Sequence, residues 1–180
     1  MRTVRTKIYK FSELSKAAQQ KAIDAHEDIN TFYDWWDLMY DDALTVGIEI
    51  KGFDCSYREE IEIDFTYDAE DTAKRILEEH GDTCDTYKTA AAFLQAVHVN
   101  QVAMALIGNE DDDFWMAKAD DNEDLRDEFK KDIGKDYLKL LREEFEYRQT
   151  SEAIIETLEA NDHEFTKEGE PYHRKRNIAA

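Results

Sequence analysis

The sequence is poor in residues that break regular structure, because its 180 residues include one proline, Pro171, and six glycines. Proline and glycine mark most turns, so their scarcity predicts long helices and few loops. There are two cysteines, Cys55 and Cys84, and their spacing matches no disulfide framework. Reduced thiols of this kind are typical of a cytosol.

Long apolar runs are also missing. The opening residues lack the apolar stretch of a signal peptide, and no segment reaches the roughly 18 apolar residues of a membrane span. The nearest, residues 89–107, is interrupted by Gln95, His98, Asn100 and Gln101, which indicates a buried or half-buried helix. We therefore expect a cytoplasmic protein without a membrane segment.

Positive charge is scarce, with 23 basic residues against 43 acidic ones and a net charge of −20. Binding to a phosphate backbone depends on Lys and Arg, so direct contact with nucleic acid is disfavoured and a basic protein is the expected partner. Hydrophobic residues still make up 42% of the chain. That share is too high for a disordered acidic tail, and we expect the chain to fold.

The hydrophobic pattern predicts an α+β fold rich in helix. Alternation predicts strands at residues 2–9, 48–54 and 60–67, with a further strand near 163–167, in one antiparallel sheet of three to four strands packed by helices. Helical spacing predicts helices from about residue 15, from 31, over 68–80 and 85–107, from 123 to about 149, and from 151. We expect a single acidic domain over 1–180 with a helical C-terminal half at about 85–160.

Motifs for catalysis or metal binding are absent from the sequence. Cys55, His80, Cys84 and His98 lack zinc-site spacing, and the aspartates after residue 119 lack the glycine and the glutamate of a calcium loop. There is no nucleophile elbow and no glycine-rich phosphate loop. We expect no enzyme activity, no cofactor and no metal. A hydrolase remains an alternative, because one pair among many carboxylates could have its pKa shifted in a pocket.

Two adjacent tryptophans, Trp35 and Trp36, stand among aspartates in the segment YDWWD. One interpretation is core packing on the apolar side of a helix. The other is an exposed indole that, with the carboxylates, binds an arginine-rich partner through cation–π contacts and ion pairs.

Negative charge is concentrated between Asn109 and Ile133, where eleven acidic residues face four basic ones. We expect Phe114, Trp115 and Met116, within the acidic stretch 109–124, to anchor a loop or short turn to the body. Carboxylates three and four apart on a helix stand about 5 to 6 Å from one another, close to the spacing of successive phosphates, so such a face can imitate nucleic acid. The alternative is a solvated acidic face. The candidate partner-binding residues are Glu110, Asp111, Asp112, Asp113, Asp120, Asp121, Glu123, Asp124, Asp127, Glu128, Trp35 and Trp36.

Four segments resemble a set of small acidic proteins encoded by phages and prophages, sometimes labelled antitoxin-like. They read KIYKFSELSKAAQQKAI at 7–23, DWWDLMYDDALTVGIEIKGFD at 34–54, HGDTCDTYKTAAAF at 80–93 and TSEAIIETLEANDHEFTKEGEPY at 150–172. The resemblance implies a phage setting and a place in the cytoplasm of the host cell. Small acidic proteins without enzyme activity often inhibit host defence nucleases in that setting.

Charge and resemblance together lead to three hypotheses. The first is an anti-defence inhibitor that binds a host nucleic-acid-handling protein, such as a CRISPR effector, through an acidic surface that imitates nucleic acid. The second is an antitoxin-like protein that neutralises a toxin by protein–protein binding, with Trp35 or Trp36 as the important contacts. The third is the hydrolase.

Overall fold

The computed structural model describes residues 7–55, 57–107 and 112–172. Its contacts divide the chain into two compact units. The terminal unit combines Met1–Trp35 with Glu144–Ala180, and the central unit is Trp36–Glu143. The expectation of one domain over 1–180 stays a prediction.

The terminal unit contains a two-stranded antiparallel sheet and short helices. Strand β1 (Tyr9–Lys10) pairs with β4 (Glu164–Phe165), and the sequence between and around them forms η1 (Phe11–Glu13), α1 (Lys16–Asp24) and α6 (Ser151–Ala160). The side chains of Ser15 and Thr150 cap α1 and α6. Its core consists of Phe11, Leu14, Ala18, Ala22, Ile154, Leu158 and Phe165.

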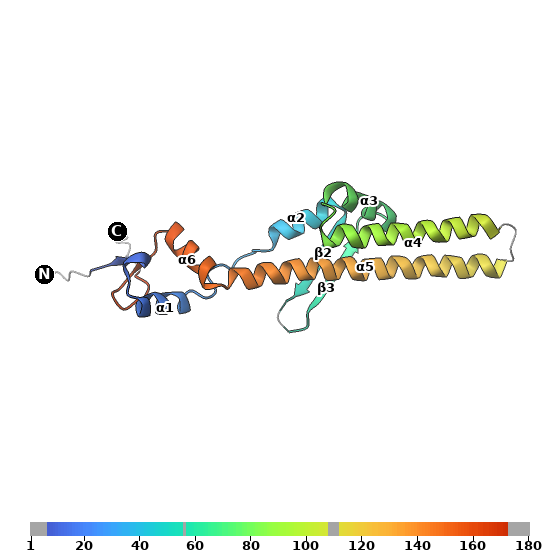
Figure 1. The fold of residues 1–180 in the computed structure, drawn as a ribbon. Helices are drawn as coiled ribbons and strands as arrows, with labels where there is room; N and C mark the ends of the chain where they lie inside the picture. Colours follow the sequence, from blue (N-terminus) through green and yellow to red (C-terminus); the bar gives the residue numbers. More distant parts are fainter. Residues whose placement is uncertain (1–6, 56, 108–111, 173–180) are drawn as a thin grey trace, which may run out of the picture. The chain divides into compact units, whose positions relative to one another are not determined.

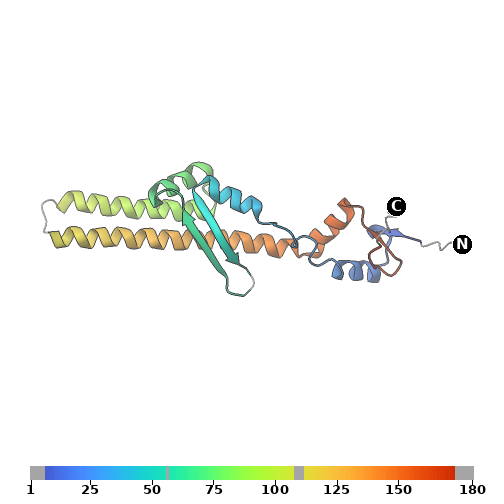
Figure 2. The ribbon, with the colours of Figure 1, turned by 180° about the vertical axis from the view of Figure 1, so that it is seen from behind.

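The central unit contains a β-hairpin and the longest helices. It is formed by α2 (Asp37–Thr45), β2 (Ile48–Asp54), β3 (Glu60–Phe65), α3 (Ala69–Glu79) and α4 (Asp85–Ile107), with α5 (Asp112–Arg148) up to Glu143 (Figure 1). The β2–β3 hairpin lies across α5 (Figure 2). The backbone at Gly134 of α5 approaches the side chains of Ile61 and Ile63 of the hairpin. Asp68 caps α3 by accepting a hydrogen bond from the Asp71 amide at 2.7 Å.

Helices α4 and α5 run side by side and share an aromatic core. The rings of Phe93 and Phe129 are stacked with centroids 4.3 Å apart, and Phe65 of β3 adds a third ring at 5.5 Å from Phe129. Ile133 and Tyr137 continue this buried face of α5. The repeat of three and four residues along α5 therefore fixes which of its sides remains open to solvent.

The α+β class and the dominance of helix are confirmed, but the single sheet of three to four strands is wrong for the described residues. Strand β2 has the predicted bounds and β3 and β4 lie within theirs, whereas β1 overlaps the predicted strand 2–9 only at Tyr9. The four strands form two sheets of two strands each. The reason is that β1 and β4 belong to the terminal unit, whereas β2 and β3 belong to the central unit. The predicted strand residues before Lys7 lie outside the described residues.

Two predicted helix boundaries also need correction. The helix expected from residue 31 begins at Asp37, and turns cover residues 31–36. The acidic stretch, where a loop or short turn was expected before a helix from Glu123, is helical from Asp112, so α5 begins earlier than predicted. Carboxylates in the first turns of a helix are favourable because the helix N-terminus carries partial positive charge.

Among the described residues, none of the helices combines the length and the apolar character that crossing a membrane requires. The cytoplasmic location stays a prediction.

Candidate partner-binding surface

Four carboxylates form a row along the side of α5 that faces α4. Asp121, Asp124, Glu128 and Asp132 are spaced by three, four and four residues, so they recur on one side of the helix. At 1.5 Å per residue the row extends over about 16 Å. We call these residues the acidic row.

The acidic row borders a groove between the two helices. A cavity of about 560 Å³ is lined by Asp121, Asp124 and Glu128 on one wall, and on α4 by Ala92, Gln95, Ala96, Val99 and Asn100. A neighbouring cavity of about 430 Å³ shares Ala92, Ala96, Leu125 and Glu128 and continues to Asp132 and Lys88. The small alanine side chains leave room beside the carboxylates, so a partner can approach them from this side.

Among the described residues, the two carboxylates in the middle of the acidic row form no ion pair. At the ends of the row, Asp132 forms an ion pair with Lys135 at 2.6 Å, and Asp121 is not without a partner. Asp124 and Glu128 are exposed, and no ion pair joins either of them to a cation within the described residues. These two carboxylates are therefore the ones most available to a basic partner.

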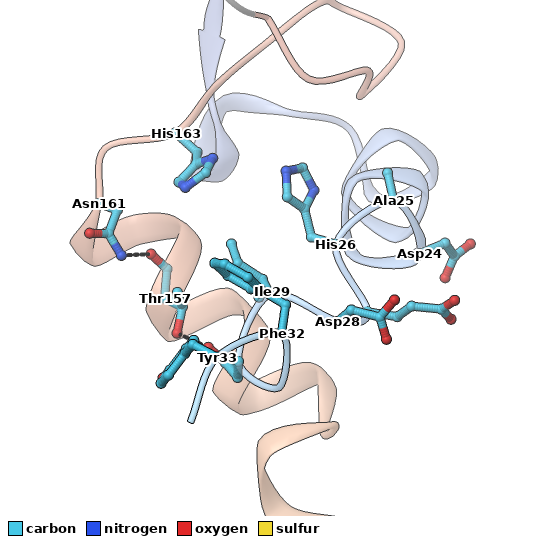
Figure 3. A pocket seen from close by; sticks show the side chains of 12 residues that line it. Asp24, Ala25, His26, Asp28, Ile29, Phe32, Tyr33, Thr157, Asn161 and His163 are labelled. Carbon is cyan, nitrogen blue, oxygen red and sulfur yellow. Dashed lines mark hydrogen bonds between the residues drawn. The ribbon is translucent and has the colours of Figure 1, made fainter. Parts of the chain in front are cut away.

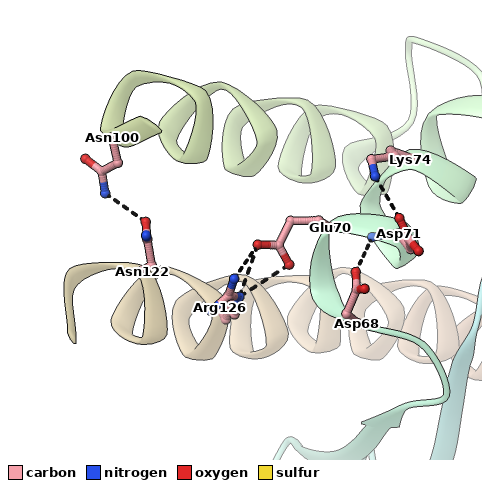
Figure 4. A network of polar contacts seen from close by, with 7 residues as sticks. All are labelled: Asp68, Glu70, Asp71, Lys74, Asn100, Asn122 and Arg126. Carbon is pink, nitrogen blue, oxygen red and sulfur yellow. Dashed lines mark hydrogen bonds and ion pairs between the residues drawn. The ribbon is translucent and has the colours of Figure 1, made fainter. Parts of the chain in front are cut away.

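A different side of α5 carries a polar network with α3 (Figure 4). Arg126 donates to both carboxylate oxygens of Glu70, with the shortest bond at 2.6 Å, and this lowers the pKa of Glu70. Lys130 pairs with Asp64 at 2.8 Å. Asp127 lines a cavity together with Arg126 and Lys130. Negative charge on this side is largely neutralised within the unit.

The predicted site residues of the acidic stretch are thus not brought together on one surface. Asp121, Asp124 and Glu128 belong to the acidic row, whereas Asp127 lies on the side of α3. The hydrogen bond to Glu70 is the main cause that raises the pKa of Arg126, and Glu123 adds a smaller contribution, which places Glu123 near that network. Asp112, Asp113 and Asp120 belong to the first part of α5. Glu110 and Asp111 lie outside the described residues.

The two tryptophans have different environments. Trp35 is buried, with 6% of its surface exposed, and its ring packs on Phe145 at 5.6 Å within the terminal unit. Trp36 is half-buried and packs edge-to-face on Phe53 at 5.6 Å within the central unit. Trp35 therefore packs in a core, but from a turn before α2 and not from the apolar side of a helix, and its buried indole is not available to a partner.

The described residues hold no cluster of three or more His, Cys, Asp or Glu side chains suited to a metal ion. A hydroxyl, an imidazole and a carboxylate do meet: Thr86 Oγ1 is 2.7 Å from His80 Nδ1, and His80 Nε2 is 3.5 Å from Asp42 Oδ2. Thr86 is only 3% exposed. Its hydroxyl is therefore out of reach of a substrate, and this arrangement gives no support to the hydrolase alternative.

Two carboxylates near the α4–α5 interface have shifted pKa values of opposite sign. Hydrogen bonds from Lys139 and Lys88 lower the pKa of Asp85 to about 2. Burial raises the pKa of Asp136, although Thr89 donates a 2.7 Å hydrogen bond to it. The ionised form of Asp136 therefore opposes folding at neutral pH.

Asp136→Asn is expected to raise the melting temperature by about 1 to 3 °C at neutral pH. The amide oxygen still accepts from Thr89, while the cost of burying a charge disappears. The gain should shrink as the pH falls through the raised pKa, because the native carboxyl then takes up a proton. Asp132→Asn makes the same charge change but breaks an ion pair, so a melting curve showing an equal gain for it would contradict this explanation.

Comparison with models of protein families, with curated proteins and with solved structures found no match for this chain.

The residues of α4 that line the groove were not predicted from the sequence. Ala92, Ala96 and Val99 look like core residues in the sequence, and only the pairing of α4 with α5 shows that they flank carboxylates. One signal was available: α4 is apolar on nearly all its sides, which is typical of a helix with more than one covered face. Nevertheless, Val99 is 58% exposed.

Proposed function

We propose that this protein is an inhibitor that binds a basic, nucleic-acid-handling protein through the acidic row of α5. The observation that carries the proposal is the pair of exposed carboxylates without an ion-pair partner among the described residues, Asp124 and Glu128, at the side of an open groove. On this proposal the row occupies positions that phosphates take in the partner's own ligand.

The geometry supports the proposal in two ways. The carboxylates repeat at one helical turn, so several cations of a partner can be engaged at once. Their location on a helix packed by Phe93 and Phe129 holds them in a fixed array before binding, which reduces the entropy lost on association. A net charge of −20 also attracts a basic partner from a distance.

The resemblance to phage-encoded proteins supports the choice of partner. We propose a host defence protein that handles nucleic acid, such as a CRISPR effector, as the target, with the chain acting in the host cytoplasm and without catalysis. Antitoxin-like neutralisation is the competing proposal, and Trp36 is its remaining aromatic candidate because Trp35 is buried. Under that alternative, Trp36→Ala would reduce binding more than changes in the acidic row.

The experiment compares two double variants that remove the same charge. Asp124→Asn with Glu128→Gln neutralises the middle of the row, and Glu152→Gln with Glu156→Gln neutralises an exposed pair at the same four-residue spacing on α6. Tagged full-length chains are used to capture proteins from a nuclease-treated host lysate, and affinity for the captured protein is measured. We expect the first variant to lose about tenfold in affinity and the second to retain it.

Salt dependence provides the second readout. Affinity of the native chain should fall steeply between about 0.1 and 0.5 M salt, since exposed charges are screened over that range. A partner held equally well at high salt, or equal losses in both double variants, would contradict binding through the acidic row.

A further inference from the structure

The terminal unit contains a cavity that the acidic row does not involve. Its volume is about 840 Å³, within the range of sites that bind small molecules or peptide segments. Its walls come from the end of α1, the turns at 25–33 and the end of α6. Figure 3 shows the imidazoles of His26 and His163 beside the side chains of Ile29 and Phe32 in this cavity.

One wall is held in place by a buried asparagine. Asn30 is 5% exposed; its amide donates to the Arg148 carbonyl at 3.2 Å, and its oxygen accepts from Thr157 Oγ1 at 2.7 Å. These bonds tie the turn to α6 and to the end of α5. Because Asn30 is buried and each end of its amide already makes one of these bonds, its role is to position the wall.

Most of the polar groups of the cavity that can still form a hydrogen bond are acceptors. The distance from His26 Nδ1 to the Ala22 carbonyl is 2.8 Å, and a carbonyl only accepts, so Nδ1 carries the hydrogen. In the neutral ring Nε2 is then an acceptor. Glu27 and Asp28 add two exposed carboxylates, and no ion pair joins either to a cation in the described part of the chain. A ligand that matches this set is rich in donors and positively charged.

The apolar part of the cavity favours a flat cation. Phe32 is 77% exposed and Tyr33 47%, and their rings meet edge-to-face at 5.5 Å. The guanidinium of Arg148 already contacts one of these rings. It lies 5.9 Å from the centre of the Tyr33 ring and donates to the Tyr33 hydroxyl at 3.0 Å. Guanidinium is planar, stacks on aromatic faces and carries five donors, whereas the ammonium of lysine is a compact point charge.

We propose that this cavity binds an arginine side chain presented by a peptide segment of a protein partner. The guanidinium stacks on Phe32 and donates to His26 Nε2 and to the carboxylates of Glu27 or Asp28. The cavity is larger than one side chain, so residues flanking the arginine also enter it. The proposal does not rest on the acidic row, because all the lining residues belong to the terminal unit.

The test titrates the full-length protein with the blocked peptide Gly-Ala-Arg-Ala-Gly and follows backbone amide NMR signals. Two matched peptides replace the arginine with citrulline, which has nearly the same shape without the charge, or with lysine. We expect the arginine peptide to bind about tenfold more tightly than the citrulline peptide, with lysine between them. The shifted amides should cluster at residues 24–33 and 157–163.

Two variants separate this site from general attraction to an acidic protein. Phe32→Ala should lose most of the preference for arginine, and the exposure of Phe32 means that the fold is retained. Tyr57→Ala removes another exposed aromatic ring, 95% exposed in the central unit, and should change nothing. The proposal is overturned if citrulline binds as well as arginine, if Phe32→Ala has no effect, or if the shifts fall on the acidic row. The last outcome would leave the proposed function standing.

Discussion

Phe129→Ala is expected to lower the free energy of unfolding of the central unit by about 3 to 5 kcal/mol. Phe129 is 3% exposed and lies between the rings of Phe93 and Phe65, at 4.3 and 5.5 Å. Removing it deletes buried apolar surface and leaves a cavity where α4, α5 and β3 meet. Because a whole protein is stable by only about 5 to 15 kcal/mol, chemical denaturation should show a large shift in midpoint.

Leu140→Ala is the matched control for this prediction. Leu140 is an apolar residue on the same helix but is 38% exposed. Its truncation should cost well under half as much, because little buried contact is lost. Equal costs for the two variants would mean that the stacked rings do not form the core of α4 and α5.

Gly169→Ala is expected to destabilise the terminal unit by about 2 to 4 kcal/mol. Gly169 has φ of +83°, a region that side chains rarely adopt, and an added Cβ would lie 2.8 Å from the Ala18 carbonyl carbon and against its oxygen. Backbone atoms cannot rotate away as a side chain can. The α1 helix would have to move from the β4 turn, and amide hydrogen exchange should show reduced protection around both segments.

Gly81→Ala serves as its comparison. A Cβ at Gly81 meets no atom within 4 Å, and φ there lies outside the left-handed region. Its unfolding free energy should change by less than about 0.5 kcal/mol. If Gly169→Ala were equally mild, the close approach of the turn to α1 would be wrong.

Local sequence signals predicted the elements whose causes are local. The alternation at 48–54 and 60–67 gave the hairpin, and helical spacing gave α3 and α6 with starts within one residue of the predicted 68 and 151. The helix over residues 85–107 was predicted with the bounds that α4 has. In each case side-chain periodicity or one capping hydrogen bond decides the outcome.

The predictions failed where contacts between residues far apart in the sequence determine the structure. The helix expected from residue 31 gives way to turns because Trp35 packs on Phe145, far along the chain, while Trp36 packs on Phe53. The single sheet failed because β1 pairs with β4, more than a hundred residues away, and periodicity carries no information on which strands pair.

The assignment of site residues stays a prediction, but part of the surface formed by the acidic row could be seen in the sequence. The acidic stretch drew attention to α5, and helical spacing alone groups Asp121, Asp124, Glu128 and Asp132 on one side. Which side faces α4 and which faces α3 depends on packing, and so the neutralising bond from Arg126 to Glu70 could not be foreseen. The cavity beside His26 and His163 combines segments from both ends of the chain, and no local pattern predicts it.

We propose that the acidic row and nucleic acid compete for the same surface of a basic partner. The most direct measurement follows fluorescence anisotropy of a labelled duplex bound to the captured partner while the native chain is added. We predict release of the duplex at equimolar chain, and little release by the variant with Asp124→Asn and Glu128→Gln. A stable complex that holds partner, duplex and chain together would contradict the claim.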